Sequence, residues 1–293
     1  MFRSRGIIPA MVTPFDDQDR VDAGALAKLT RYLLDAGVHG LFCAGSQGES
    51  YALTYEEKKT ISETVIKEAA GSVPVYVGTG AVTTGESVKL TQMAEACGAD
   101  AVTVITPYFI APSQDELYQH YAAIARSTRL PVFLYSNPSR TGVSISPALI
   151  GRLSKIENIA GIKDSSGDLT LTMSYIGAGG PDFNVLMGRD TLIYASLCCG
   201  ARGAVAATAN VVPALAVSIY ERFQKGDHEG ALRAQFDLEP VRTAFNLGTF
   251  PVVVKEALTM MGIPMGPCRA PVGDLPESKK EELKAVLRRM GLI

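Results

Sequence analysis

Two polar side chains stand where short apolar runs end, and their types suit a covalent reaction intermediate. Lys163 ends the run Asn-Ile-Ala-Gly-Ile-Lys, and Tyr135 ends the run Val-Phe-Leu-Tyr. A neutral lysine amine can attack a carbonyl and form a Schiff base, and a phenol beside it can carry protons. The alternatives are a lysine that reaches solvent or pairs with Asp164, and a tyrosine that belongs to the core.

A glycine-flanked turn supplies a third candidate position. Ser46 and Gln47 lie in Ala-Gly-Ser-Gln-Gly-Glu-Ser, which also follows an apolar run. The two glycines would let backbone N–H groups converge on an anion. An ordinary tight turn is the alternative.

Other catalytic motifs are incomplete in this sequence. Gly78-Thr-Gly80 lacks the third glycine of a dinucleotide-binding loop, because position 83 is threonine. The three histidines lack metal-ligand spacing, and Ser46 lacks the G-x-S-x-G context of a hydrolase. We therefore expect no metal and no nucleotide cofactor.

The elements that must position these residues alternate regularly up to about residue 225. Continuous apolar runs are typical of parallel strands that are covered on both faces. Eight strand–helix units predict a (β/α)8 barrel (TIM barrel) of the α/β class, with a doubly wound open sheet as the alternative. The expected strands are Gly6–Val12, Val38–Cys43, Val73–Val77, Ala101–Ile105, Val132–Tyr135, Ile159–Ile162, Asn184–Met187 and Gly203–Ala206.

Helix starts can be recognised between these strands, and helices alone are expected after them. Segments 227–246, 252–261 and 277–290 have helical patterns. We therefore expect a catalytic barrel at 1–225 and a small helical C-terminal domain at 226–293. The predicted helix starts are a cap at Asp22, capping boxes at Thr54–Glu57, Thr83–Glu86 and Ser113–Glu116, and Ser146 before Pro147.

Three motifs, each following a predicted strand or ending it, resemble the dihydrodipicolinate synthase/N-acetylneuraminate lyase family of class I aldolases. They are Gly45-Ser-Gln-Gly-Glu49, Tyr135-x-x-Pro-Ser-Arg-Thr-Gly142 and Gly161-Ile-Lys-Asp164. The resemblance covers nearly the whole chain, including Thr106-Pro-Tyr108 and Ala209-Asn210. It implies a barrel with a helical extension, a homotetramer built as a pair of dimers, and an imine between enzyme and pyruvate without metal or nucleotide.

The resemblance also implies a role for individual residues. Lys163 would form the imine, Tyr135 would move protons, and Ser46 would contribute a hydroxyl at the catalytic centre. Ser46 and Gln47 stand where the synthases have two threonines that hold the pyruvate carboxylate. Arg140 would bind the carboxylate of the aldehyde partner, since its fork binds a carboxylate through two hydrogen bonds. Other expected substrate-binding positions are Gly188, Val205, Tyr108 and Phe109.

Departures from the synthases affect the expected substrate. The residue after Tyr108 is Phe109, where the synthases have a tyrosine lent across a dimer interface to a hydroxyl relay. Gly-Ser-x-Gly-Glu and Ile-Lys-Asp-Ser-Ser-Gly-Asp are more similar to the family's 2-oxo-acid aldolases, whereas Pro-Ser-Arg-Thr-Gly is more similar to the synthases.

We expect a class I lyase that uses or releases pyruvate, acting as a 2-keto-3-deoxy-sugar-acid or 4-hydroxy-2-oxoglutarate type aldolase. The first alternative is a synthase that condenses pyruvate with aspartate semialdehyde in lysine biosynthesis. The others are a non-catalytic module that binds small molecules and a phosphate-handling barrel isomerase. Gly188-Arg-Asp and Arg202-Gly203 supply only fragments of the anion site that the isomerase needs.

Composition argues against several classes of partner and location. The formal net charge is −2 and the isoelectric point is near 6.0, whereas nucleic-acid binding usually requires a basic surface. The five cysteines are odd in number and unpatterned, which is typical of a reducing compartment. No apolar run reaches about 18 residues, and prolines break the only N-terminal apolar stretch. We expect a cytoplasmic protein with no membrane and no nucleic-acid partner.

Overall fold

A single sheet of eight parallel strands forms the centre of the molecule in the computed structural model, which describes residues 2–293. Strand order runs β1-β8-β7-β6-β5-β4-β3-β2, and a parallel bridge from Ala10 to Phe42 joins the two ends. The predicted (β/α)8 barrel is thereby confirmed, and the open sheet is wrong. The strands are β1 (Gly6–Pro9), β2 (Leu41–Cys43), β3 (Val75–Gly78), β4 (Ala101–Ile105), β5 (Val132–Ser136), β6 (Ile159–Asp164), β7 (Asn184–Met187) and β8 (Gly203–Ala206).

The strands are buried almost throughout, as their apolar composition predicts. Three strands have the predicted bounds, and β1 and β2 are shorter than predicted. Beyond β1, Ala10 and Met11 still donate backbone hydrogen bonds to Ala206 and Phe42, but they do so as a bridge and not as a continuous ladder. After Pro9 the chain passes from pairing with β8 to a bridge with Phe42 of β2. The regular ladder of β1 therefore ends at Pro9, which explains why β1 is shorter than predicted.

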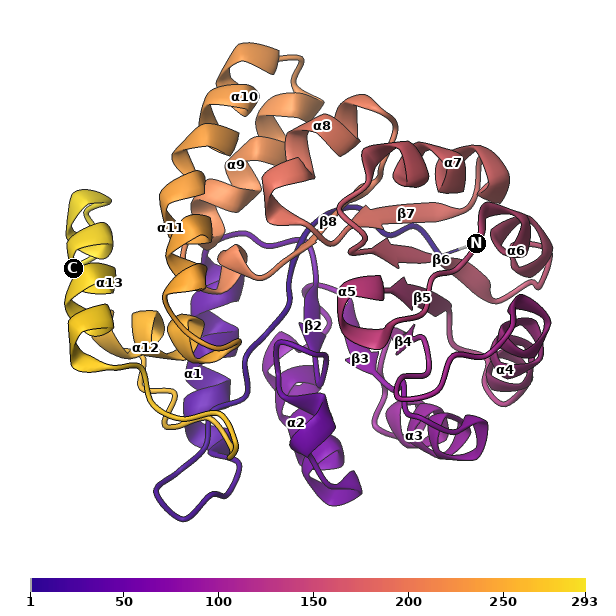
Figure 1. Ribbon diagram of the computed structural model, residues 1–293, viewed down its shortest axis with the longest axis horizontal. Helices are drawn as coiled ribbons and strands as arrows, with labels where there is room; N and C mark the ends of the chain where they lie inside the picture. Colours follow the sequence, from indigo (N-terminus) through magenta and orange to yellow (C-terminus); the bar gives the residue numbers. More distant parts are fainter. Residues whose placement is uncertain (1) are drawn as a thin grey trace.

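Helices surround the barrel and cover the outward face of the strands (Figure 1). The caps at Asp22, Thr54, Ser113 and Ser146 are confirmed, and the boxes of Thr54 and Ser113 are complete on both sides. At Thr83 only half of the box forms, with Thr83 accepting from the Glu86 backbone. The covering helices are α1 (Ala23–Asp35), α2 (Tyr55–Ala69), α3 (Thr84–Ala96), α4 (Gln114–Arg126), α6 (Pro147–Leu153), α7 (Leu169–Gly179), α8 (Ile193–Cys198) and α9 (Pro213–Gln224).

The C-terminal segment is helical, but its first helix is divided. The helical pattern over 227–246 is confirmed, but the structure divides the segment: α10 (His228–Asp237) ends just before α11 (Glu239–Ala244), and η4 (Phe245–Leu247) follows. Pro240 explains the break, since it has no backbone N–H to donate to the preceding turn. The remaining helices are α12 (Val252–Met260) and α13 (Glu277–Arg289).

The C-terminal helices pack on one side of the barrel (Figure 1). Val253, Leu258, Leu283 and Leu287 belong to the same buried hydrophobic cluster as residues of the barrel. The predicted domain boundary at 225/226 falls between α9 and α10, and the independence of the two parts stays a prediction. Among residues 2–293, no helix combines the length and apolarity needed to cross a membrane.

Candidate active site

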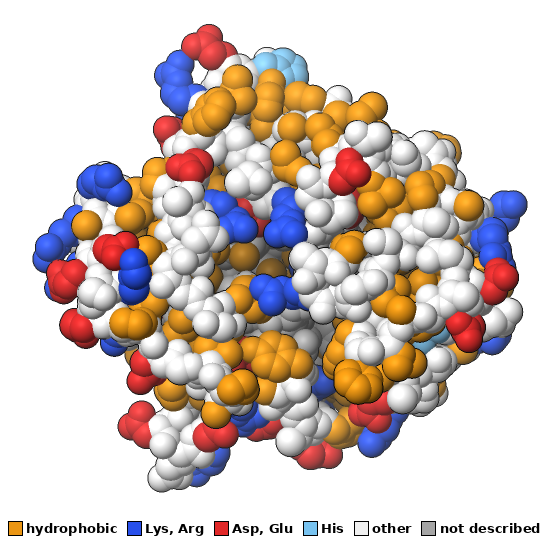
Figure 2. Space-filling view, viewed as in Figure 1, with side chains coloured by type: hydrophobic (Ala, Val, Ile, Leu, Met, Phe, Trp, Pro, Cys, Tyr) orange, Lys and Arg blue, Asp and Glu red, His pale blue; other side chains and the backbone are white. Residues whose placement is uncertain are grey.

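A cavity of about 400 Å³ opens at the carboxyl ends of the strands, which is where barrel enzymes place their active sites. Figure 2 shows it as a hollow at the centre of one face, with blue Lys and Arg side chains around it. The lining residues are Ala10, Ser46, Gln47, Tyr135, Asn137, Ser139, Arg140, Lys163, Ser165, Gly188, Arg189, Asp190, Val205, Ala207, Arg242, Phe245, Asn246, Gly248 and Phe250.

Lys163 and Tyr135 form the floor of this cavity. They are register partners on the neighbouring parallel strands β6 and β5, so the sheet itself holds the two side chains together. The Lys163 amine lies 4.1 Å from the centre of the Tyr135 ring and 4.8 Å from that of Phe42. Lys163 is only 5% exposed. The amine therefore sits in a mostly aromatic pocket whose open side faces the cavity.

The Tyr135 hydroxyl is held by a small polar network. Asn137 Nδ2 donates to Tyr135 Oη over 3.0 Å, and Ser139 Oγ donates to Asn137 Oδ1 over 3.0 Å. Burial by itself would raise the pKa of Tyr135. The charge of Lys163 and the hydrogen bonds of Ser46, Ser165 and Asn137 outweigh burial, so the pKa lies below its usual value of 10.0. A phenol with a lowered pKa is a better proton carrier near neutral pH.

Ser46 and Gln47 reach the cavity from the turn after β2. The Ser46 hydroxyl is one of the groups that lower the pKa of Tyr135. Gln47 is 4% exposed, and its Nε2 has no hydrogen-bond partner within residues 2–293. A buried amide without a partner is unfavourable unless a ligand accepts its hydrogen bond. This end of the cavity is thus built to receive an acceptor such as a carboxylate.

A buried ion pair holds that turn in place. Glu49 has a left-handed backbone with φ of +56°, and its carboxylate meets the Lys255 amine at 3.1 Å. The second Glu49 oxygen accepts from the backbone N–H of Arg269 at 2.9 Å. Both side chains of the pair are at most 2% exposed. The C-terminal helix α12 is in this way connected directly to the residues beside Ser46 and Gln47.

The ends of β7 and β8 form the opposite wall. Gly188 and Val205 both line the cavity, as the resemblance implies. A Cβ at Gly188 would lie 2.0 Å from Ser165 Oγ, so only glycine allows this close approach. Arg189 Nε donates to the Ser165 carbonyl over 3.0 Å. Asp190 is buried and accepts from the backbone N–H of Thr208 over 2.7 Å.

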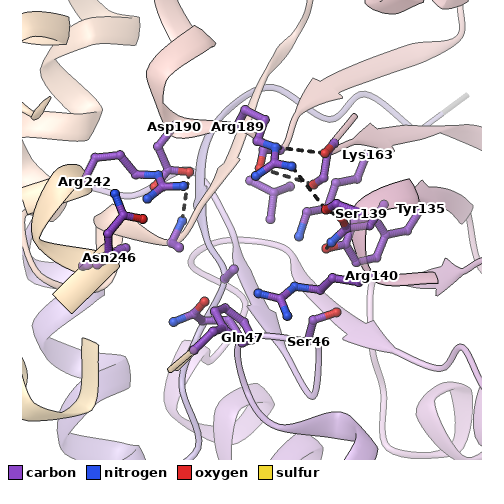
Figure 3. Close-up of a pocket in the computed structure, with 18 of the residues that line it drawn as sticks. Ser46, Gln47, Tyr135, Ser139, Arg140, Lys163, Arg189, Asp190, Arg242 and Asn246 are labelled. Carbon is purple, nitrogen blue, oxygen red and sulfur yellow. Dashed lines mark hydrogen bonds between the residues drawn. The ribbon is translucent and has the colours of Figure 1, made fainter. Parts of the chain in front are cut away.

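Arg140 and several C-terminal residues complete the mouth of the cavity. Arg140 lies on the short helix α5 (Pro138–Thr141), directly after β5, and its guanidinium stacks 3.9 Å from the Phe250 ring centre. Arg242 comes from α11 and Asn246 from η4. In the view of Figure 3, Arg242 and Asn246 lie across the cavity from Lys163 and Tyr135.

The structure brings most of the predicted site residues together, but not all of them. Ser46, Gln47, Tyr135, Arg140, Lys163, Gly188 and Val205 all line the cavity. Tyr108 and Phe109 do not line it in this single chain, and Phe109 is 96% exposed with φ of +76°. Contact of Tyr108 and Phe109 with substrate stays a prediction, and it would require that a second copy of the chain brings these residues to the cavity.

Sequence reasoning overlooked several lining residues. Asn137 and Ser139 follow Tyr135 so closely that their positions after a predicted strand could have identified them. Arg189 and Asp190 stand at another strand end and had the same signal. No sequence pattern identifies Arg242 and Asn246 as lining residues, because the helices after residue 225 reach the barrel mouth only through tertiary packing.

Comparison with known proteins agrees with this geometry. The model of the "Dihydrodipicolinate synthetase family" matches residues 3–290. A protein of Methanopyrus kandleri named 4-hydroxy-tetrahydrodipicolinate synthase is 37% identical over all of this chain and 98% of its own. A Moorella thermoacetica protein of the same name is 38% identical, over 98% of both chains.

The fold is similar to that of solved structures at comparable identity. One is a prophage protein of E. coli K12, described as a member of the dihydrodipicolinic acid synthase family in complex with pyruvate. It is 34% identical, with a TM-score of 0.95 over 99% of both chains. The names of the two relatives favour the first alternative of the sequence analysis, the synthase, over the 2-oxo-acid aldolase that we expected first.

Proposed function

Because the chain belongs to the dihydrodipicolinate synthetase family and is an enzyme of the lyase type found there, we propose that it binds pyruvate as an imine on Lys163 and condenses it with aspartate semialdehyde. The name of the two relatives, 4-hydroxy-tetrahydrodipicolinate synthase, supports a synthase activity. One observation carries the proposal: the sheet register sets Lys163 and Tyr135 side by side at the floor of a polar cavity.

Imine formation needs a nucleophile and a proton carrier. Once it has given up a proton, the Lys163 amine adds to the keto carbon of pyruvate, and the keto oxygen leaves as water after protonation. Tyr135 would transfer the protons, since its ring contacts the Lys163 amine and a hydrogen bond from Asn137 orients its hydroxyl. The pyruvate carboxylate fits between Ser46 and Gln47, where the unpartnered Gln47 amide gains an acceptor.

Condensation then forms one carbon–carbon bond. Tyr135, deprotonated after it has given up its proton, accepts a proton from the pyruvate methyl group, and the resulting enamine attacks the aldehyde carbon of the partner through its terminal carbon. Tyr135 returns a proton to the developing alkoxide. The partner's amine then attacks the imine carbon and releases Lys163 as a free amine. No electrons are exchanged with an external acceptor, and the imine itself accepts the electron pair when the enamine forms, so the proposed steps use neither a metal nor a nucleotide.

A second candidate retains the first half of this chemistry. Phe109 has no hydroxyl with which to extend a proton relay from a neighbouring copy, so the substrate's own hydroxyls or water would replace it. A 2-keto-3-deoxy sugar acid or 4-hydroxy-2-oxoglutarate carries such hydroxyls. On these substrates the same imine would be formed by cleavage, with pyruvate as the product.

A panel assay separates the two candidates. Purified protein is given pyruvate with aspartate semialdehyde and, in the other direction, 2-keto-3-deoxygluconate or 4-hydroxy-2-oxoglutarate, and pyruvate use or release is measured. Turnover with aspartate semialdehyde at about 1–10³ s⁻¹, at least tenfold faster than cleavage, is the expected result. Faster release of pyruvate from the 2-oxo acids would establish the aldolase, and no turnover together with no imine would leave only a binding module.

The assembly and location follow from the same proposal. We expect a homotetramer, in which a neighbouring copy could bring Tyr108 and Phe109 to the cavity mouth. A cytoplasmic location fits the five cysteines, all free among the described residues, and the availability of pyruvate there.

A further inference from the structure

The cavity contains more positive charge than pyruvate and one carboxylate contact require. Four cationic side chains line it (Lys163, Arg140, Arg189 and Arg242) against one carboxylate, Asp190. Asp190 is itself buried, and its oxygens already accept from the backbone N–H groups of Ala207 and Thr208. A partly enclosed cavity with uncompensated cations attracts ligands of opposite charge. A ligand of this cavity should therefore bring more than one acidic group.

Among the three arginines of the cavity, Arg242 has the most distant contact: Arg140 also makes no ion pair or side-chain hydrogen bond within the described residues, but it stacks 3.9 Å from the Phe250 ring centre. Within the described chain the Arg242 guanidinium makes no ion pair or hydrogen bond, and its one aromatic neighbour, Phe245, lies 5.9 Å from it. Arg189, in contrast, donates to the Ser165 carbonyl and to Ser139 Oγ. The N–H groups of the Arg242 guanidinium are therefore free to bind a ligand in the cavity. No contact within the described chain accounts for a positive charge at this position.

The helix that carries Arg242 is held firmly against the barrel. Gln235 on α10 donates through Nε2 to the Asp190 carbonyl over 2.9 Å and accepts from the Tyr194 backbone over 3.0 Å. Val241 and Ala244 on α11 are buried on either side of Arg242. This packing holds the backbone of α11 at the cavity mouth, so α11 carries Arg242 to the cavity without the help of a ligand.

We propose that Arg242, with Asn246 beside it, forms a second anion-binding position of this cavity, which acts together with Arg140 on the acidic group of the aldehyde partner of pyruvate. The inference rests on the proposed function for the identity of the reacting end. In the view of Figure 3 the two residues lie across the cavity from Lys163, so a ligand joined to Lys163 could extend its far end toward them. The group is a carboxylate or a phosphate, since a guanidinium binds either through paired hydrogen bonds.

Kinetics with aldehydes of different charge test the position. The variants are Arg242→Gln, Arg242→Lys and Asn246→Ala, with Arg288→Gln as a matched control on the exposed end of α13. Partners are succinate semialdehyde (one carboxylate), glyceraldehyde 3-phosphate (one phosphate) and uncharged glyceraldehyde, at saturating pyruvate. We expect Arg242→Gln to raise KM for the acidic aldehydes about 10- to 100-fold and to leave KM for glyceraldehyde within about twofold. Arg242→Lys should restore part of the loss.

The pattern of results decides the inference. A larger effect with glyceraldehyde 3-phosphate identifies a phosphate position, and a larger effect with succinate semialdehyde identifies a carboxylate position. An equal rise in KM for charged and uncharged aldehydes, or no rise for either acidic one, would overturn the proposal.

A binding measurement separates this inference from the proposed function. Glutarate has two carboxylates and neither a ketone nor an aldehyde group, so it cannot form an imine. Its Kd, measured by calorimetry, should weaken about 10- to 100-fold in Arg242→Gln and stay unchanged in Arg288→Gln. An unchanged Kd in Arg242→Gln overturns the anion position alone. Absence of a pyruvate adduct on wild-type Lys163 overturns the proposed function alone.

Discussion

At the scale of single residues, the chemistry depends on which groups neighbouring strands place side by side. Lys163 and Tyr135 lie side by side in the cavity because they are register partners on adjacent strands.

Borohydride added with pyruvate should reduce the imine and add the mass of the adduct to the peptide that contains Lys163. Lys163→Arg should give no adduct and no turnover while the protein stays folded, because a guanidinium remains protonated. Mass spectrometry and circular dichroism check the two results, and an adduct on another lysine would contradict the assignment.

Tyr135→Phe should lower turnover much more than stability. The change removes a proton carrier worth about 10²–10⁴-fold in rate and keeps the ring that contacts Lys163. Because the pKa of Tyr135 lies below 10.0, wild-type kcat should fall on the alkaline side as the phenol loses its proton. That alkaline limb should be absent from the residual activity of the variant. Tyr121→Phe, at a buried tyrosine that bonds only to the Val104 carbonyl, is the control and should retain kcat.

Arg140→Ala should affect the aldehyde partner and not pyruvate. Its guanidinium stands at the cavity mouth on Phe250, away from the Lys163 floor. Loss of one charge-assisted contact costs about 1.5–3 kcal/mol, so KM for aspartate semialdehyde should rise about 10- to 100-fold. The yield of the reduced pyruvate adduct should be unchanged. Equal loss of adduct and of aldehyde affinity would show that Arg140 supports the imine step or the fold.

At the scale of elements, the turn after β2 depends on a helix that lies more than 200 residues later in the chain. The buried pair of Glu49 and Lys255 joins the two, and the Lys255 amine also donates to the Pro267 carbonyl. Removing one partner of a buried ion pair leaves the other charge without compensation.

We therefore expect Lys255→Met to lower the free energy of unfolding by about 3–5 kcal/mol and to weaken pyruvate binding through the displaced Ser46–Gln47 turn. The surface pair of Lys279 and Glu282 provides the comparison, since Lys279→Met should cost at most about 1 kcal/mol. Urea denaturation of both variants measures the difference. Equal, small effects would mean that the buried pair does not stabilise the junction between α12 and the barrel.

At the scale of the whole molecule, one loop tip is hard to explain in an isolated chain. Phe109 is 96% exposed and Ile110 57% exposed, on the segment after β4, and Phe109 has the positive φ that non-glycine residues rarely adopt. Large exposed apolar side chains at consecutive positions are typical of a contact surface. Because the family resemblance implies a homotetramer, we expect a second copy of the chain to cover this loop.

Light scattering after size exclusion should give a mass of about four times 31.1 kDa. Phe109→Asp should shift the distribution to smaller species and reduce activity, because a charged carboxylate in an apolar interface is costly. Ile293→Asp, at the partly exposed chain end, should leave the assembly intact. A wild-type monomer with full activity would contradict both the assembly and the role of a neighbouring copy at the site.

The barrel, the family and the reactive residues Ser46, Tyr135 and Lys163 could be predicted from the sequence. These depend on short-range patterns: apolar runs give the strands, capping residues give most helix starts, and motifs beside Ser46, Tyr135 and Lys163 give the chemistry. The break between α10 and α11 at Pro240 was not predicted, although its cause, the missing backbone N–H of proline, is local and can be read from the sequence.

Only the tertiary structure decided which distant residues share the cavity. Arg242, Asn246 and Phe250 reach it because the C-terminal helices pack over the barrel through a common hydrophobic cluster, and the pairing of Glu49 with Lys255 depends on the same packing. Such contacts join positions far apart in the chain, so no local pattern of residues encodes them.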